Sequence, residues 1–345
     1  MKFKFTLGVD MSKEWFNFCL MNAEFQTLWQ GQVDNNEESI FKFLTQLSQR
    51  EEVTKAQAVL ADIVLIMEHT GIYVQHLVKC YLSKAGPVSL VHASKVSDLL
   101  AGKQKWDEKT DQMDARRLAE YGIRYKDKLE LWQAKEPTLI KLRVLQRQRR
   151  RLKDAMNLLE VPVNESVQFD SVAVSELLKT NQQATIEALK NDLKNIEKQL
   201  QQLMESDVEL TQLFNLITSV PGVGAVTARE VIITTSAFKD FTPKQAKQFA
   251  RYAGVTPKDK QSGKMKKRKR TSKRGNKKLK SLLTMGATSL IGTNSELGFY
   301  YLKKIEEGKR HFSVINAMRN KLILRIFAVV RNQVTYKKNM NICLD

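Results

Sequence analysis

Acidic residues stand at positions where a protein could hold a metal ion. Asp10 and Glu68 each end an apolar segment that the pattern predicts to be a strand. Asp111 and Asp114 are three residues apart at the start of a predicted helix, so their side chains share one face. Carboxylates at neighbouring strand ends can converge on Mg²⁺ (or Mn²⁺), and two such ions stabilise the attacking and leaving oxygens of a phosphodiester.

The alternative is that these acids are ordinary surface charges. An acid in the first turn of a helix is stabilised by the helix dipole without any ligand, and this alternative is strongest for Asp111. It is weaker for Asp10 and Glu68, because an acid next to a buried strand is costly without a partner. The pattern as a whole favours a metal site.

A glycine-containing turn at 220–230, VPGVGAVTARE, is typical of a helix-hairpin-helix motif. Gly222 and Gly224 permit a tight turn, and their backbone N–H groups can approach a phosphate at the start of the next helix. A plain turn between two helices is the alternative. The surrounding sequence favours contact with DNA that does not depend on base sequence.

Ser262 lies in a strongly basic segment, 258–280, which has thirteen Lys or Arg residues against one Asp. Serine needs activation to act as a nucleophile, and nearby cations could provide it. A loop serine with no role is the alternative. The segment contains glycines and lies between apolar stretches, so we predict a loop within a domain that binds phosphates. The basic residues expected to contact nucleic acid are Lys264, Lys266, Lys267, Arg268, Lys269, Arg270, Lys273 and Arg274.

The elements that must position the acids form an α/β pattern. Apolar runs predict strands at 3–10, 16–23, 25–33, 61–68 and 87–93. Helical spacing predicts helices at 37–49, 73–85, 94–102 and 110–125. This order predicts a mixed sheet with helices packed on it, in a domain that spans 1–134.

The remainder of the chain is predicted to be mostly helical. Two heptad patterns, one from Leu142 to Leu159 and one from Leu189 to Leu203, predict coiled-coil or linker helices in 135–208, with 160–182 as their connection. The second seam could pair within the chain or between chains. A mostly α domain follows at 209–345, and its tail is one amphipathic helix over about 312–335.

Composition points to a polyanionic partner. The chain has 345 residues, 42% of them hydrophobic, and 57 Lys or Arg face 37 Asp or Glu, for a net charge of +20. Such a charge repels itself in a compact fold unless a polyanion binds. No apolar stretch is long enough for a membrane span, and the cysteines Cys19, Cys80 and Cys343 make no metal-spaced pair. We therefore expect a cytoplasmic protein that binds nucleic acid and no membrane.

Several motifs together resemble a known family. LGVDMSKEW, MEHTGIY and KTDQMDARRLAEY resemble the DEDD motif of bacterial insertion-sequence transposases, the relatives of the Piv invertase and of bridge-RNA-guided recombinases. SVPGVGAVTA, FARYAGVTPKDKQSG and SKRGNKKLKSLLTMGA resemble the second domain of the same family. The resemblance covers nearly the whole chain.

The resemblance implies an RNase H-like, RuvC-like first domain and a nucleoid-associated bacterial enzyme. It implies that Asp10, Glu68, Asp111 and Asp114 bind the metal, and that Ser262 attacks the DNA backbone. It also implies a homodimer or tetramer in which the acids of one subunit meet the serine of another. The partners that it implies are double-stranded DNA and a structured guide RNA.

Two other functions fit the same residues. A Holliday-junction resolvase or nuclease would use the acids alone, with water as nucleophile, and would not need Ser262. A non-catalytic nucleic-acid-binding protein would need no metal, but the complete set of acids argues against it. The leading hypothesis is a transposase or site-specific recombinase that cleaves and rejoins double-stranded DNA.

Overall fold

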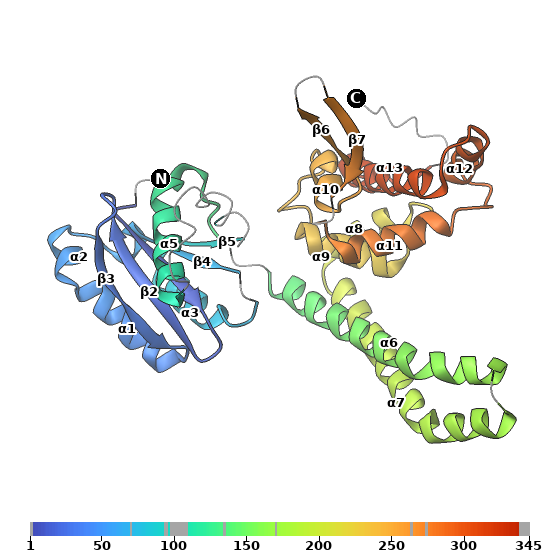
Figure 1. The fold of residues 1–345 in the computed structure, drawn as a ribbon, viewed down its shortest axis with the longest axis horizontal. Coiled ribbons are helices and arrows are strands. Elements are labelled where there is room, and N and C mark those ends of the chain that lie inside the picture. The colour runs from blue at the N-terminus through green and yellow to red at the C-terminus, as the bar shows by residue number, and fades with distance from the viewer. Residues whose placement is uncertain are drawn as a thin grey trace. The chain divides into compact units, whose positions relative to one another are not determined.

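The computed structural model describes residues 3–69, 71–92, 96, 110–133, 136–169, 171–262, 265–272 and 275–337, and only the backbone of 258–262 and 265–270. The chain divides into two compact units, Met1–Ala134 and Lys135–Asp345. The first is an α/β unit and the second is mostly helical (Figure 1). Within the described residues, no helix is long and apolar enough to cross a membrane.

The first unit is built on a five-stranded mixed sheet with the order β3-β2-β1-β4-β5. Its strands are β1 (Phe5–Met11), β2 (Trp15–Asn22), β3 (Thr27–Asp34), β4 (Ile63–Glu68) and β5 (Val88–Val91). The first three strands form an antiparallel meander, and β4 and β5 run parallel to β1. Strands β1 and β4 are almost continuously apolar because both of their faces are covered. The predicted mixed sheet is confirmed.

Helices cover both faces of this sheet. On one face, α1 (Glu37–Gln49) and α3 (Gln75–Ser83) pack their apolar stripes against β1, β2 and β4. On the other face, α5 (Asp111–Arg124) packs against β1, β2 and β4. The short α2 (Glu51–Lys55) and two 3₁₀ turns, Leu60–Asp62 and Lys126–Lys128, complete the unit. The helix predicted at 94–102 lies outside the described residues, except for Val96.

The second unit begins with two long helices, α6 (Pro137–Phe169) and α7 (Val172–Glu205), which pack along each other as an antiparallel hairpin (Figure 1). The prediction that 160–182 is a connection was wrong, because α6 continues to Phe169 and α7 already begins at Val172. Val163, Ser166 and Ser175 are buried at this end of the pair, so tertiary packing outweighs the helix-breaking effect of Pro162.

The apolar seam of α7 is used within the chain. Ile196 and Leu200 are buried in one core with Leu139 and Leu142 of α6. Of the two pairings that the heptads left open, these residues therefore make the one within the chain. A different surface would have to join two copies.

Shorter helices form the core of the second unit. They are α8 (Val208–Thr218), α9 (Ala225–Thr235), α10 (Ala246–Tyr252), α11 (Lys277–Thr288), α12 (Glu296–Glu306) and α13 (His311–Asn332). Helix α13 corresponds to the predicted tail helix and runs through the centre of the core, where Leu322 and Phe327 are buried.

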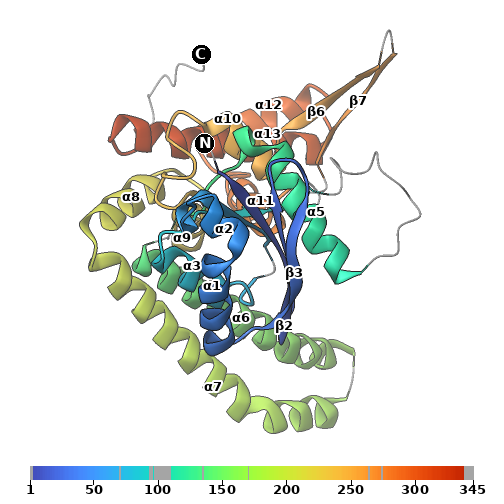
Figure 2. The same cartoon turned by 90° about the vertical axis from the view of Figure 1, so that its left-hand side faces the viewer.

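The basic segment up to Thr271 is a β-hairpin and not the predicted loop, and its last residues, from Lys277, begin α11. Strands β6 (Pro257–Ser262) and β7 (Met265–Thr271) pair antiparallel, and Figure 2 shows them extending away from the helices of their unit. Only two residues separate the paired Ser262 and Met265, which is the loop length of the tightest hairpins. Antiparallel pairing satisfies the backbone polar groups that β6 and β7 turn toward each other. The high charge of these strands hid the strand pattern.

Candidate active site

Asp10 and Glu68 lie at the ends of adjacent strands and on the same face of the sheet. Strands β1 and β4 are parallel, and their register pairs Val9 with Met67, one residue before each acid. Side chains alternate along a strand, so Asp10 shares its face with Gly8, and Glu68 shares its face with Ile66. Gly8 and Ile66 both face α5, and the two acids therefore belong to the α5 side of the sheet.

Helix α5 comes exceptionally close to β1, and Gly8 makes this possible. A Cβ atom on Gly8 would lie 2.1 Å from the Ala115 oxygen and 2.3 Å from the Ala119 nitrogen, both backbone atoms. One step along, a Cβ on Gly122 would lie 2.5 Å from Cγ2 of Thr6. The helix thus runs antiparallel to β1, and its first turn lies at the Asp10 end of the strand.

The first turn of α5 carries the other two acids. Thr110 caps the helix by accepting a hydrogen bond from the Met113 N–H, and Asp111 and Asp114 follow in the first turn. The side chain of Gln112 donates a hydrogen bond from Nε2 to the Phe18 oxygen at 2.9 Å. This bond ties the turn to β2, so sheet and helix together position all of the acids at one end of the sheet.

The electrostatics of Asp10 reflect this arrangement. Burial is the largest cause that raises the pKa of Asp10 from 3.8 to about 6. The negative charges of Asp114, Asp111 and Glu68 raise this pKa further, in that order, and a hydrogen bond from the Met11 backbone opposes them. Negative charges held close together in this way repel one another, and a bound cation would relieve that repulsion.

The acids are neighbours, but they do not close around one point. Among the described residues, no group of three or more His, Cys, Asp or Glu side chains has the geometry to hold a metal ion. Asp114 accepts a hydrogen bond from Nη1 of Arg117 at 2.9 Å. Mg²⁺ needs only one or two protein carboxylates when waters and substrate phosphates supply its other ligands. The oxygen donors here fit such a hard divalent ion.

Two polar neighbours escaped the sequence analysis. Asn17 pairs with Asp10 across β1 and β2 and is 9% exposed, and Gln112 anchors the turn between two of the acids. A polar residue inside the apolar strand WFNFCLMN was the signal for Asn17. No sequence signal marked Gln112, because its role depends on how α5 docks.

The predicted residues of the second unit lie in two places. Gly222 has φ +84°, and a Cβ there would lie 2.7 Å from the Gly286 oxygen, so it serves the packing of its turn against α11. Gly224 is exposed at the start of α9, has open space around it, and caps the helix without a side chain.

The other predicted residues of this unit belong to the basic hairpin. Ser262 ends β6, and the run Lys266–Arg270 lies within β7. Lys264, Lys273 and Arg274 lie outside the described residues. Ser262 belongs to the second unit and the acids belong to the first.

Comparison with known proteins identifies matches in both units. Residues 7–160 match the family model of a DEDD-type IS110 transposase, and residues 214–302 match that of the IS116/IS110/IS902 transposase family. The pilin gene-inverting proteins of Moraxella bovis and Moraxella lacunata are each 26% identical over 337 residues, which cover 97% of this chain and 98% of each relative.

Two further similarities are partial. An uncharacterised 43.6 kDa protein of the insertion element IS110 from Streptomyces coelicolor is 26% identical over 157 residues, which cover 46% of this chain and 37% of that protein. The solved structure of T. thermophilus RuvC in complex with a Holliday junction substrate aligns with 37% of this chain and 99% of its own, at 9% identity and a TM-score of 0.28. A TM-score this low does not establish a common fold.

Proposed function

This chain belongs to the DEDD-type IS110 family of transposases and is an enzyme that acts on DNA. From that premise we propose that it cleaves and rejoins double-stranded DNA. The observation that carries the proposal is the placement of Asp10, Glu68, Asp111 and Asp114 near one another at one end of the sheet, where burial first and the other three negative charges second raise the pKa of Asp10 to about 6. Repelling carboxylates at strand ends are suited to a divalent cation, Mg²⁺ or Mn²⁺.

The first unit is then an RNase H-like catalytic domain. Support comes from its strand order, in which an antiparallel meander is extended by two parallel strands on the β1 edge. The central strand β1 and its neighbour β4 carry two of the acids, and a helix on one face carries the others. When bound, the divalent ion would stabilise the negative charge that develops on the phosphate oxygens.

Ser262 is the proposed nucleophile. Its Oγ loses its proton and forms a bond to phosphorus, while the bond from phosphorus to the sugar oxygen breaks and that oxygen takes up a proton. A DNA hydroxyl then attacks the phosphoserine ester, reforms the phosphodiester and returns the proton to Ser262. The phosphoserine ester replaces the broken phosphodiester bond with a bond of similar free energy, so rejoining needs no external energy source. The family resemblance and the cations of β7 support this role.

A suicide substrate tests the proposal. Incubation of the full chain with nicked duplex DNA and Mg²⁺ should give a covalent adduct on a denaturing gel. Ser262→Ala should bind DNA without forming the adduct, and Asp10→Ala should bind without cleaving. Ser272→Ala is a matched control, because it removes a hydroxyl from the same basic segment, and it should form the adduct as wild type does.

The outcomes separate the two enzyme mechanisms. If Ser262→Ala cleaves DNA as well as wild type does, the serine mechanism is wrong, and the water-dependent resolvase mechanism replaces it. If Asp10→Ala also cleaves, the acids are not the metal site. Phosphopeptide mapping of the wild-type adduct to Ser262 would support the serine directly.

Assembly and guidance by RNA complete the proposal. At the far end of the α6–α7 hairpin, apolar side chains are exposed, among them Leu158, Phe169, Val172 and Leu177. This set, which we call the hairpin tip, is a surface suited to a second copy in a homodimer or tetramer.

A structured guide RNA is proposed from the family resemblance. Sequencing of RNA that copurifies with the protein tests it, and the absence of any enriched structured RNA would contradict it.

A further inference from the structure

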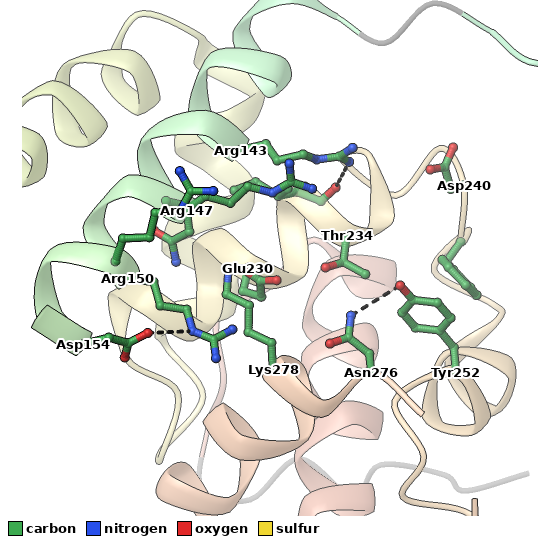
Figure 3. Close-up of a pocket in the computed structure, with 14 residues that line it drawn as sticks. Arg143, Arg147, Arg150, Asp154, Glu230, Thr234, Asp240, Tyr252, Asn276 and Lys278 are labelled. Carbon is green, nitrogen blue, oxygen red and sulfur yellow. Dashed lines mark hydrogen bonds and ion pairs between the residues drawn. The ribbon is translucent and has the colours of Figure 1, made fainter. Parts of the chain in front are cut away.

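The second unit contains a cavity of about 670 Å³ between α6, α9, α10 and the start of α11 (Figure 3). Five basic and three acidic side chains line it. Four of the basic ones are arginines that follow one another along α6, namely Arg143, Arg147, Arg150 and Arg151. We call this site the arginine cavity. It contains neither the acids of the first unit nor Ser262.

Most of these arginines have no carboxylate partner. Arg150 forms an ion pair with Asp154, with Nε and Oδ2 3.6 Å apart, and Lys278 forms one with Glu230 at 2.6 Å. Arg143 donates only to the Ile233 backbone oxygen, at 3.3 Å. Among the described residues, Arg143, Arg147 and Arg151 have no ion pair. Three unpaired guanidinium groups around one hollow repel each other, and an anion would remove that repulsion.

The cavity also contains a buried hydrogen-bond acceptor that has no partner, in the side chain of Gln146. Gln146 is 2% exposed and lines the cavity, and its Nε2 donates to the Val226 oxygen at 3.2 Å. Its Oε1 has no hydrogen-bond partner. A buried acceptor without a partner costs free energy, so a ligand that donates a hydrogen bond would be favoured there. An ordinary solvated row of arginines would not explain this feature.

The opposite wall presents an aromatic ring. Tyr252 is 45% exposed, packs against Phe241 with ring centroids 5.4 Å apart, and accepts a hydrogen bond from Nδ2 of Asn276 at 3.3 Å. Figure 3 shows Tyr252 and Asn276 across the cavity from Arg147 and Arg150. The site thus combines cations on one side with a stacking surface on the other. Proteins use this arrangement to bind single-stranded nucleic acids.

We propose that the arginine cavity binds one or two nucleotides of single-stranded nucleic acid, with the phosphates at the α6 arginines and a base against Tyr252. The volume is within the range of cavities that bind small ligands, whereas a duplex is too wide to enter. DNA and RNA share the phosphodiester and the base faces, so either can supply the strand. This site goes beyond the proposed cleavage chemistry, because binding here needs no metal and no serine.

Binding measured by fluorescence anisotropy tests the proposal. The full chain in EDTA, which prevents cleavage, is titrated with a labelled 20-nucleotide single strand of DNA, the same strand of RNA, and the DNA duplex. The double variant Arg147→Ala/Arg151→Ala should bind single strands roughly tenfold or more weakly, and the salt slope should fall by about 0.7 for each lost phosphate contact. If the double variant loses more affinity for the RNA strand than for the DNA strand, the bound strand is RNA, and the reverse result identifies DNA.

A matched control separates the cavity from general charge. Lys141→Ala/Lys153→Ala removes the same charge from the same helix at positions that do not line the cavity. Tyr252→Leu should weaken single-strand binding by about tenfold, and Tyr252→Phe should not, because stacking needs only the ring. Photocrosslinking with 5-iodouracil in the strand should label Tyr252. Thermal melting checks that each variant is folded.

Three results would overturn the proposal. In the first, Arg147→Ala/Arg151→Ala loses no more affinity than the lysine control does. In the second, the duplex loses as much affinity as the single strands, which would make the arginines a general duplex-binding surface. In the third, a poly-glutamate peptide competes as well as the oligonucleotide does, which would make the cavity a docking site for an acidic protein segment.

Discussion

The acidic end of the first unit and the arginine cavity of the second both hold like charges together, but on different supports. The acids project from two adjacent strands and one helical turn, which backbone contacts at Gly8 lock together. The arginines project from one face of α6 on long side chains, and Arg147 and Arg151 are exposed. One charged site has short carboxylates on packed backbone, and the other has long guanidinium side chains, two of which are exposed.

This difference indicates different tasks. Phosphoryl transfer requires groups that hold their positions to within about half an ångström, and rigid elements provide this. Binding of a flexible strand tolerates adjustable side chains, since a phosphate can be met by several guanidinium rotamers. The first site should therefore depend on rigid packing, and the second unit on charge and surface contact.

The largest effect is expected at Gly8. Gly8→Ala places a methyl group 2.1 Å from a backbone oxygen of α5, and backbone cannot rotate away as a side chain can. We expect a loss of about 3 kcal/mol in the free energy of unfolding and loss of cleavage. Urea denaturation measures it. Gly31→Ala on β3 is the control, because its Cβ would meet only the Phe18 ring at 3.2 Å, and a similar loss there would contradict the argument.

The hairpin tip should give the next largest effect. Phe169 is 82% exposed and Leu177 is also exposed, so neither contributes much to the fold of one copy. Phe169→Ser with Leu177→Ser should weaken self-association by about fiftyfold, as measured by analytical ultracentrifugation. Phe299→Ser is a control for an exposed aromatic residue on α12. An unchanged dissociation constant would exclude the tip as the interface.

The sequence predicted that the four acids lie near one another, because the signals for this placement are local. Asp10 and Glu68 follow apolar runs that only a covered sheet explains, and parallel neighbouring strands bring their ends together. The spacing of Asp111 and Asp114 predicted their shared face. The docking of α5 was not predictable, since it depends on contacts between Gly8 and Ala115 that are far apart in the sequence.

The second unit was harder to predict. Charge in 258–280 masked a strand pattern, so a hairpin was taken for a loop. The first heptad pattern ends at Leu159, so a connection was predicted from 160, but packing against α7 extends α6 to Phe169. The arginine cavity gave no signal, because it joins α6 to helices about 80 or more residues away, as the bond from Gln146 to Val226 illustrates.

A smaller effect on stability is expected from the charge of Asp10. Its pKa is raised to about 6 in the folded protein from an ordinary value of 3.8, so folding favours the protonated form. Above pH 6 the Asp10 carboxylate is charged in both the folded and the unfolded state, and only in the folded state does its burial near other acids cost free energy. Between pH 6 and pH 4 that cost declines, because the folded state takes up the proton first.

Asp10→Asn should therefore stabilise the protein in EDTA at pH 8 by about 1 kcal/mol, and by less as the pH falls toward 4. Chemical denaturation at both pH values measures the difference from wild type. Asp34→Asn at the exposed end of β3 serves as the control. If Asp10→Asn were less stable than wild type at pH 8, the strain assigned to the acidic end would be absent.

The smallest effect concerns the basic strand β7, where charge acts without a cavity. Lys266→Ala with Lys269→Ala should weaken duplex binding roughly threefold at physiological salt and reduce the salt slope by about 0.9 for each lost phosphate contact. The loss should be the same for duplexes of different sequence, because phosphate contacts carry no base information. Lys303→Ala with Lys309→Ala removes equal charge from exposed positions outside the hairpin and should leave the slope closer to that of wild type. A loss confined to one duplex sequence would mean that β7 reads bases, and the comparison would then change, because this strand would select a sequence as well as hold the backbone.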